Sequence, residues 1–186
     1  MNEASILEQI KQAKDNATLL HSSEVINQAL NKLQIQLTND YSNKNPVFLV
    51  VMNGGLIFAG KILPQLNFPA QIDYCHATRY RGETSGGQIE WKAKPQMDLA
   101  NRHVVVVDDI LDEGYTLQAI VNACQEMGAA SIKTLVLIEK LHDRKAIPDM
   151  KPDYCELETP DQYIFGFGMD YNHYWRNCDE IYLLNE

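Results

Sequence analysis

The chain has 186 residues, 45% of them hydrophobic, which suits one domain with a sizeable core. Its 16 Lys and Arg against 25 Asp and Glu give a net charge of -9, which argues against nucleic acid or an anionic membrane as the main partner. The four cysteines are widely spaced and suggest neither zinc nor disulfides, and neither a signal peptide nor a membrane-length apolar run is evident, so we expect a cytoplasmic protein.

The chain begins with two predicted helices. Residues 4–14 and 23–38 carry apolar side chains at helical spacing, and Ser22 or Ser23 suits the N-cap of the second helix. Residues 39–45 are rich in Ser and Asn and predict a loop. Because both helices have one apolar face, we expect them to pack on a sheet.

A strand and a pair of glycines follow. The apolar run 47–51 predicts a strand, and Gly54 and Gly55 lead from it into a predicted helix over 56–66. Glycines in this place let the backbone approach a ligand closely, although such a pair is also typical of an ordinary tight turn.

The next segment contains a stretch without any apolar period. Residues 70–78 and 89–92 predict strands, and the stretch 79–88 between them holds three glycines. This stretch is either an exposed hairpin loop or a lid that closes over an active site. The lid residues that would reach a phosphate-rich substrate are Arg79, Tyr80 and Arg81.

The centre of the chain is the segment 103–117. Four consecutive valines are typical of a strand buried on both faces in a parallel sheet, and they predict a strand that ends at Val107. A helix with apolar spacing follows and stops at Gly128. The turn between strand and helix contains three carboxylates: Asp108, Asp109 and Asp112.

This turn combines two kinds of binding group. In open α/β sheets ligands bind off the carboxyl ends of the strands, and a helix N-terminus offers amides to an anion. Asp108 and Asp109 suit sugar hydroxyls or a metal, the 113–116 backbone suits a phosphate, and Asp112 is placed to act as a general base. An isolated aspartate pair would more often only cap a strand end, but the third carboxylate, the glycine and the helix start favour a sugar-phosphate site.

The last third of the chain adds more strands. Residues 132–138 predict a buried strand, 141–153 a loop, and 154–157, 163–167 and 181–184 short strands. Alternating strands and helices predict an α/β protein with a mainly parallel central sheet flanked by helices.

The central segment also carries a family resemblance. VVVVDDILDEGYTL at 104–117 resembles the phosphoribosyl-diphosphate (PRPP) binding motif of type I phosphoribosyltransferases. Other pieces, in family order, are similar to the 6-oxopurine branch of that family. These pieces are VVMNGG at 50–55, RYRGETSGG at 79–87, VLIEK at 136–140 and PDYCELETPDQYIFGFGMDYNHYWRN at 152–177.

The resemblance covers roughly residues 20–184 and implies a fold and an activity. The implied fold is a single domain over 1–186, with a core at about 40–150 and a small hood from about 1–39 and 151–186. The implied activity is transfer of the phosphoribosyl group of PRPP to hypoxanthine or guanine, giving IMP or GMP plus pyrophosphate. The family also implies Mg²⁺ as cofactor and a homodimer or homotetramer.

The resemblance further implies roles for individual residues. The ribose and the 5′-phosphate of PRPP would be bound by Asp108, Asp109, Glu113, Gly114, Tyr115 and Thr116. The pyrophosphate would be bound by Met52, Asn53, Gly54, Gly55 and Arg176. The metal would be held by Asp108, Asp109 and Asp170. Asp112 would be the catalytic residue that handles the proton on purine N7.

Three residues would recognise the purine. Lys140 would donate to the 6-oxo group, Tyr163 would stack on the base, and the backbone of Ile164 would read its far edge. One position departs from some relatives, because Asn53 stands where they have a lysine. The first peptide of the loop that contains Asn53 is often cis in the family.

Three alternatives remain open. Residues 108–112 spell DDxxD, a magnesium-diphosphate motif of isoprenyl diphosphate synthases, which are all-α proteins; four valines before it argue against a helix. A PRPP-binding regulator of nucleic acids could share the fold, although the charge of -9 opposes it. Xanthine or another base could also be the preferred acceptor.

Overall fold

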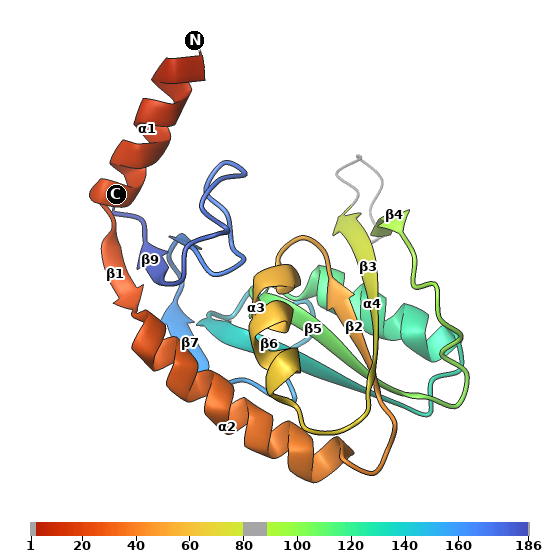
Figure 1. The fold of residues 1–186 in the computed structure, drawn as a ribbon. Helices are drawn as coiled ribbons and strands as arrows, with labels where there is room; N and C mark the ends of the chain where they lie inside the picture. The colour runs from red at the N-terminus through yellow and green to blue at the C-terminus, as the bar shows by residue number, and fades with distance from the viewer. Residues whose placement is uncertain (1–2, 80–88, 186) are drawn as a thin grey trace.

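The computed structural model describes residues 3–79 and 89–185, and its centre is a sheet of six strands. The strands are β2 (Val47–Val51), β3 (Gln71–Arg79), β4 (Ile89–Ala93), β5 (His103–Leu111), β6 (Ser131–Leu141) and β7 (Leu157–Pro160). They lie in the order β4-β3-β2-β5-β6-β7, and only the edge strand β4 is antiparallel to its neighbour (Figure 1). The predicted mainly parallel α/β sheet is confirmed.

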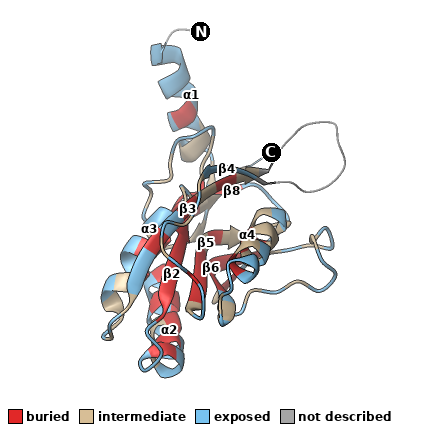
Figure 2. Cartoon of the chain, turned by 90° about the vertical axis from the view of Figure 1, so that its right-hand side faces the viewer, coloured by how far each residue is buried: buried red, intermediate tan, exposed pale blue. Residues whose placement is uncertain are grey.

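Helices cover both faces of this sheet. α2 (Ser23–Tyr41) and α3 (Gly55–Ile62) pack on one face, and α4 (Tyr115–Glu126) packs on the other (Figure 2). Alternate valines of β5 belong to the two cores, Val105 and Val107 with α2 and α3, and Val104 and Val106 with α4. The valine run shows no polar alternation because both of its faces are buried.

The connections of the sheet diverge between β2 and β5. From β2 the chain passes through α3 to β3 on one side, and from β5 it passes through α4 to β6 on the other. Such a switch point leaves a crevice at the carboxyl ends of the strands. The pairing of β5 with β2 ends at Val107, whereas its pairing with β6 continues to Leu111, so the last part of β5 has a neighbour on one side only.

The two ends of the chain form a second, antiparallel sheet of three strands in the order β1-β9-β8. Its strands are β1 (Thr18–His21), β8 (Ile164–Phe165) and β9 (Ile181–Leu183). α1 (Glu3–Asp15) extends away from the rest of the molecule (Figure 1), and its Ile10 carbonyl accepts a hydrogen bond of 2.8 Å from the Trp175 indole. This contact joins the N-terminal segment to the C-terminal one. The prediction that residues 4–14 pack on the central sheet is wrong, since α1 projects away from it and buries only Ile10.

Several predicted bounds are wrong. β5 does not end at Val107, because β6 continues the hydrogen-bonded ladder to Leu111, and Asp108 and Asp109 therefore lie on the strand. α2 runs to Tyr41, into the predicted loop 39–45, because this buried tyrosine continues the apolar face of the helix.

The short strands of the chain ends were also predicted imperfectly. β1 was not predicted, since its four residues become a strand only by pairing with distant β9. Of the predicted strand 154–157 only Leu157 lies in a strand, and Tyr154 makes an isolated bridge. The predicted strand 163–167 shrinks to β8 because the chain turns at Gly166 and Phe167, whose φ angles are 102° and 49°.

The predicted lid lies mostly outside the described residues. Arg79 is the last residue of β3, and Tyr80 and Arg81 belong to the undescribed 80–88, so the lid stays a prediction. Within residues 3–79 and 89–185, none of the helices combines the length and the apolar character that a membrane crossing requires.

Close packing of α3 on β5 yields a first prediction. An ideal Cβ on Gly55 would lie 2.6 Å from the carbonyl oxygen of Val107, whereas a Cβ on Gly60 of the same helix would meet nothing within 4 Å. We expect Gly55→Ala to lower the free energy of unfolding by about 1–3 kcal/mol through overpacking. Gly60→Ala, the matched control, should be neutral or stabilise by about 0.5–1 kcal/mol. Urea denaturation measures both, and equal stabilities of the two variants would contradict the described contact.

Candidate active site

A cleft of ≈ 540 Å³ lies at the switch point, between the carboxyl ends of β2 and β5. The turn after β2, the end of β5, the start of α4 and part of the C-terminal segment line it. The predicted site residues among its walls are Met52, Asn53, Gly54, Asp108, Asp109, Asp112, Glu113, Gly114, Tyr115, Thr116 and Arg176. The fold thus brings residues from three distant parts of the sequence into one crevice.

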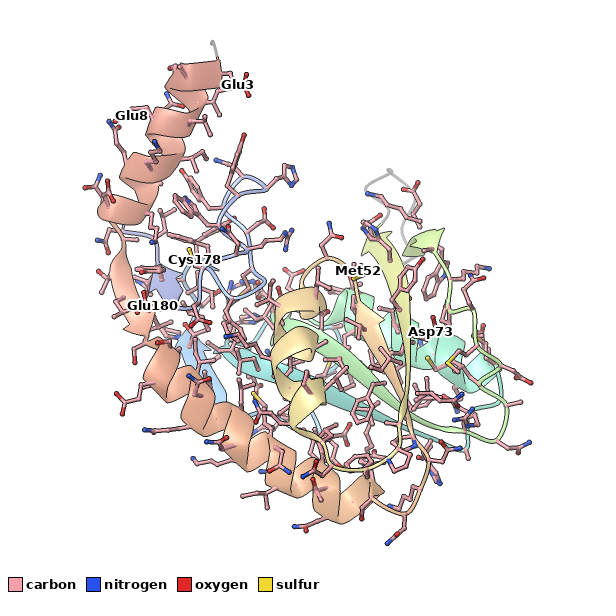
Figure 3. All side chains as sticks on the ribbon, in the orientation of Figure 1. Glu3, Glu8, Met52, Asp73, Cys178 and Glu180 are labelled. Atoms are coloured by element: carbon pink, nitrogen blue, oxygen red, sulfur yellow. The ribbon has the colours of Figure 1, made fainter. Side chains whose placement is uncertain are left out.

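The turn after β2 approaches β5 very closely. Figure 3 labels Met52 at the carboxyl end of β2, and the peptide between Met52 and Asn53 is cis, as the resemblance implies. A Cβ on Gly54 would come within 2.5 Å of the Asp109 carboxylate, and a Cβ on Gly168 would come within 2.3 Å of the Gly54 carbonyl oxygen. Glycine is therefore needed at both positions, because the loops that contain Gly54 and Gly168 meet strand β5 at Asp109.

The paired aspartates are crowded and poorly solvated. Asp109 is 7% exposed, and its amide donates to Asp108 Oδ1 at 3.0 Å. Burial raises the pKa of both carboxyl groups, and in Asp108 the charge of Asp109 raises it further, while the positive charge of Arg176 lowers both. A cation or a set of hydroxyl donors would stabilise two carboxylates in this setting.

The DDxxD alternative is wrong on this geometry. Residues 108–111 belong to β5 of a parallel sheet, whereas that motif needs a long helix in an all-α protein.

The start of α4 is shaped for an anion. Gly114 is its N-cap, with φ 85°, and a side chain there would also meet the sulfur of Met150 at 2.6 Å. Glycine has no side chain to cap the helix, and residues 113–117 line the cleft. The positive end of the helix dipole therefore faces the crevice.

Asp112 sits between two basic side chains. Lys140 Nζ donates to its Oδ2 at 2.8 Å, and His142 Nε2 lies 2.7 Å from its Oδ1. Burial by itself would raise the pKa of Asp112, but the hydrogen bonds and charges of Lys140 and His142 outweigh it and bring the pKa below its usual value. The carboxylate is ionised and held at both oxygens.

Lys145 hydrogen-bonds the backbone that carries Asp112 and Lys140. Its ammonium group donates to the carbonyl oxygens of Leu111 (3.3 Å), Asp112 (2.9 Å) and Lys140 (2.8 Å). The Glu139 carboxylate lies 3.7 Å away and balances its charge. One buried lysine thus joins the ends of β5 and β6, from which Asp112 and Lys140 project.

In the C-terminal segment, Asp170 fixes Arg176. The guanidinium donates to Asp170 Oδ1 at 2.5 Å and to the Gly168 carbonyl at 2.6 Å, while the His173 amide donates to Asp170 Oδ2 at 2.8 Å. The half-exposed Tyr163 donates to the Asp170 carbonyl oxygen at 2.8 Å. Arg176, fixed in this way, lines the cleft.

Some predicted residues do not line the cleft. Lys140 contacts the lining residue Asp112, Ile164 is buried in the core, and Gly55, Tyr163 and Asp170 are not among the lining residues. The roles predicted for all of these residues stay predictions.

Other site residues were missed in the sequence. His76, Lys92 and His173 line the cleft, and His142 contacts Asp112. One signal for His142 was available, because it follows Lys140 by two positions at the end of a strand, and such residues share a face.

A second carboxylate, that of Asp161, lies near Asp112 and His142. The potential ligand atoms of Asp112, His142 and Asp161 lie within 4.8 Å of one another. Both Asp161 oxygens accept from the Arg144 guanidinium, and Lys140 is bound to Asp112, so these carboxylates already face cations. The group is an ion-pair network and not a metal site.

Comparison with known proteins gives a consistent result. Residues 17–173 match the family described as phosphoribosyl transferase domain. The hypoxanthine-guanine phosphoribosyltransferase of Streptococcus pneumoniae is 32% identical over 173 residues, which cover 92% of this chain and 95% of that protein. The hypoxanthine-guanine-xanthine phosphoribosyltransferase of Tritrichomonas foetus is 33% identical over 172 residues, 92% of this chain and 93% of that protein.

A solved structure of a hypoxanthine phosphoribosyltransferase from Staphylococcus aureus is also similar. It has a TM-score of 0.86 and 26% sequence identity, and the match covers 92% of this chain and 94% of that one. The chain belongs to the phosphoribosyl transferase family, in the branch of the hypoxanthine-guanine phosphoribosyltransferases.

Proposed function

We propose that the protein is a purine-salvage enzyme, which transfers the phosphoribosyl group of PRPP to hypoxanthine or guanine and releases pyrophosphate with IMP or GMP. The observation that carries this proposal is the single cleft that joins the PRPP-like motif of β5 and α4, the glycine turn after β2 and Arg176. In addition, Lys140 from the next strand is bound to Asp112 at the edge of this cleft.

The walls of the cleft divide by the ligand group that each would bind. We assign the ribose hydroxyls to Asp108 and Asp109, and the 5′-phosphate to the backbone of 113–116 at the start of α4. We assign the pyrophosphate to the backbone of residues 52–55 and to Arg176. Asn53 has no charge to offer, so the amides and Arg176 must balance that anion.

The paired aspartates fit the magnesium ion of the proposal. Mg²⁺ prefers oxygen ligands, and Asp108 and Asp109 offer two crowded carboxylates whose raised pKa a neighbouring cation would lower. Asp170, the third residue predicted for the metal, holds Arg176. Bound Mg²⁺ would supply positive charge to the pyrophosphate leaving group.

Asp112, Lys140, Tyr163 and Ile164 make up the proposed purine site. In the reaction, N9 of the base attacks C1 of the ribose, and the bond from C1 to the pyrophosphate oxygen breaks. Asp112 accepts the N7 proton, Lys140 donates to the 6-oxo oxygen, and the ring of Tyr163 stacks on the base while the Ile164 backbone reads its edge. Donors that are fixed before the reaction, such as Arg176, stabilise the negative charge that develops on the leaving pyrophosphate without having to reorganise.

The proposal also covers the oligomeric state, the cellular location and a second acceptor. The residues Leu56, Ile72 and Tyr74 are 49%, 62% and 50% exposed beside a largely apolar groove between α3 and β3, which supports a homodimer or homotetramer. We place the enzyme in the cytoplasm, since four free thiols suit a reducing compartment. Xanthine is a second candidate acceptor, because one relative that is 33% identical carries it in its name.

A turnover assay tests the function directly. Purified protein with PRPP and Mg²⁺ receives hypoxanthine, guanine, xanthine or adenine in parallel, and nucleotide formation is followed by absorbance. We expect rapid formation of IMP and GMP and little AMP, since Lys140 can only donate to the purine 6-position. No consumption of PRPP with any base, together with tight binding of RNA or DNA, would favour the nucleic-acid regulator instead.

The role of Asp112 yields a second prediction. Asp112→Asn should lower kcat by about 10²- to 10⁴-fold, because an amide cannot accept the N7 proton, while the KM for PRPP changes little. Asp149→Asn is the control, since Asp149 is exposed, lies outside the cleft and has φ 58°, which Asn tolerates. Steady-state kinetics on both variants decides, and a kcat like that of the wild type in Asp112→Asn would remove this residue from the mechanism.

The role of Tyr163 yields a third prediction. Tyr163→Ala should raise the KM for hypoxanthine about tenfold or more, because stacking on a base is worth about 1–3 kcal/mol. Tyr163→Phe keeps the ring and loses only the hydrogen bond to the Asp170 carbonyl, so its KM should stay close to that of the wild type. If the two variants shift the KM equally, the hydrogen bond matters and stacking does not.

A further inference from the structure

His142 is the most buried of the side chains that bind Asp112. Its ring is 4% exposed, against 12% for the Lys140 side chain and 42% for that of Asp112. Both ring nitrogens have partners: Nε2 lies 2.7 Å from Asp112 Oδ1, and Nδ1 lies 3.0 Å from the backbone nitrogen of Arg144. The imidazole is therefore fixed between the carboxylate and its own backbone.

The contact with Arg144 decides which ring nitrogen carries the proton. A backbone amide can only donate, so Nδ1 of His142 must accept the hydrogen bond from Arg144. The proton of the neutral ring then sits on Nε2 and points at Asp112 Oδ1. The geometry selects one tautomer, and that tautomer donates to the proposed general base.

The two partners of Asp112 are not equivalent. Under the proposed function Lys140 must turn to the 6-oxo oxygen of the purine, and this movement releases Asp112 Oδ2. His142 is held at both nitrogens and has no such second partner in the reaction, so Oδ1 keeps its donor.

We propose that His142 is a positioning residue for phosphoribosyl transfer, which holds Asp112 Oδ1 throughout turnover so that Oδ2 alone takes the purine N7 proton when Lys140 leaves it. In this step the N7–H bond breaks, an O–H bond forms at Oδ2, and the electron pair stays in the purine ring as N9 bonds to C1. The inference rests on the proposed function, because it assumes that Asp112 receives the proton.

Departure of Lys140 also changes the basicity of Asp112. Burial raises the pKa of this carboxyl group, and Lys140 and His142 together bring it below the usual value. When Lys140 moves to the substrate, one of the two lowering partners is lost and the pKa rises, which makes Asp112 a better base at the time when the proton must be taken. His142 remains and prevents the carboxylate from turning away.

The surroundings of the ring contain several charged groups. Asp112 and Asp161 have oxygens near it, within 4.8 Å of one another and of a ring nitrogen. Arg144 binds both oxygens of Asp161 and lies 3.9 Å from Glu113, while Lys145 pairs with Glu139 beside the strand end. Asp112 Oδ1 lies at hydrogen-bond distance from Nε2, 2.7 Å, and is therefore the acceptor of the ring's Nε2–H.

Two variants of matched size separate positioning from packing. His142→Gln can place an amide N–H where Nε2–H lies, whereas His142→Leu fills the space without a donor. We expect His142→Leu to lower kcat by about 10- to 100-fold, the scale that misplacing a reacting group produces, with an unchanged KM for PRPP. His142→Gln should stay within about threefold of the wild type, since it keeps a donor for Oδ1.

The pH profile supplies a readout that a purely structural role would not move. The acid limb of kcat/KM reports the free enzyme, where Asp112 must be ionised. Loss of a donor that lowers the pKa of Asp112 should move this limb to higher pH in His142→Leu, and His142→Gln should restore it. If His142→Leu had the kcat of the wild type and an acid limb of kcat/KM at the same pH, the proposal would be overturned. Equal impairment of both variants without a shift of the limb would also overturn it.

A ¹⁵N NMR spectrum of the imidazole rings tests the contact without turnover. We expect the signal that disappears in His142→Gln to belong to a ring with protonated Nε2 and unprotonated Nδ1, and a proton on Nδ1 instead would overturn the proposal. The turnover assay on the wild type separates the two levels. No turnover there removes the proposed function and this inference together, whereas normal turnover with unaffected variants removes only the role of His142.

Discussion

The structure depends on the pairing of β5 with β6 beyond the point where β2 ends. Leu111 lies opposite Glu139 in this ladder, so the next residues along the two chains come together: Asp112, just after β5, and Lys140, near the end of β6. On the other side β2 has already turned into the 52–55 loop, which leaves the β2-facing edge of Asp108 and Asp109 to the cleft. Because β5 pairs with β6 beyond the end of its pairing with β2, the fold forms both the crevice and the contact between Asp112 and Lys140.

The two halves of the cleft are held by different physical means. On the side proposed for the phosphates, the candidate binding groups are backbone amides and a helix start, which glycines at 54 and 114 keep free of side chains. On the side proposed for the purine, the candidate binding groups are the charged side chains of Asp112 and Lys140. The ammonium group of Lys145 fixes the strand ends that bear them. Backbone groups suit an anion of fixed shape, while a lysine that can change partners suits a step in which a proton moves.

The sequence predicted the parts of this arrangement that local patterns encode. The valine run predicted a strand buried on both faces. The motif from Asp108 to Thr116 predicted the ligand site whose residues form one wall of the cleft. Local patterns could not predict β1, because its four residues form a strand only by pairing with β9. They also could not predict the extension of β5, which depends on its pairing with β6. The spacing of two between Lys140 and His142 could have placed both on one face, but their contact with Asp112 depends on the register between β5 and β6, which no local pattern encodes.

The acidic residues of the site fall into two classes by the direction of their pKa. The pKa of Asp112 is lowered because basic side chains bind it directly. Burial raises the pKa of Asp108 and of Asp109 against the positive charge of Arg176, and the charge of Asp109 adds to this effect in Asp108. A carboxylate of the first class already has its charge balanced and must lose a partner before it can act as a base. One of the second class gains stability from any cation or hydroxyl that arrives. A net charge of -9 is therefore compatible with the proposed anionic substrate, because only the carboxylates of the second class leave their charge to be balanced by a ligand or a cation.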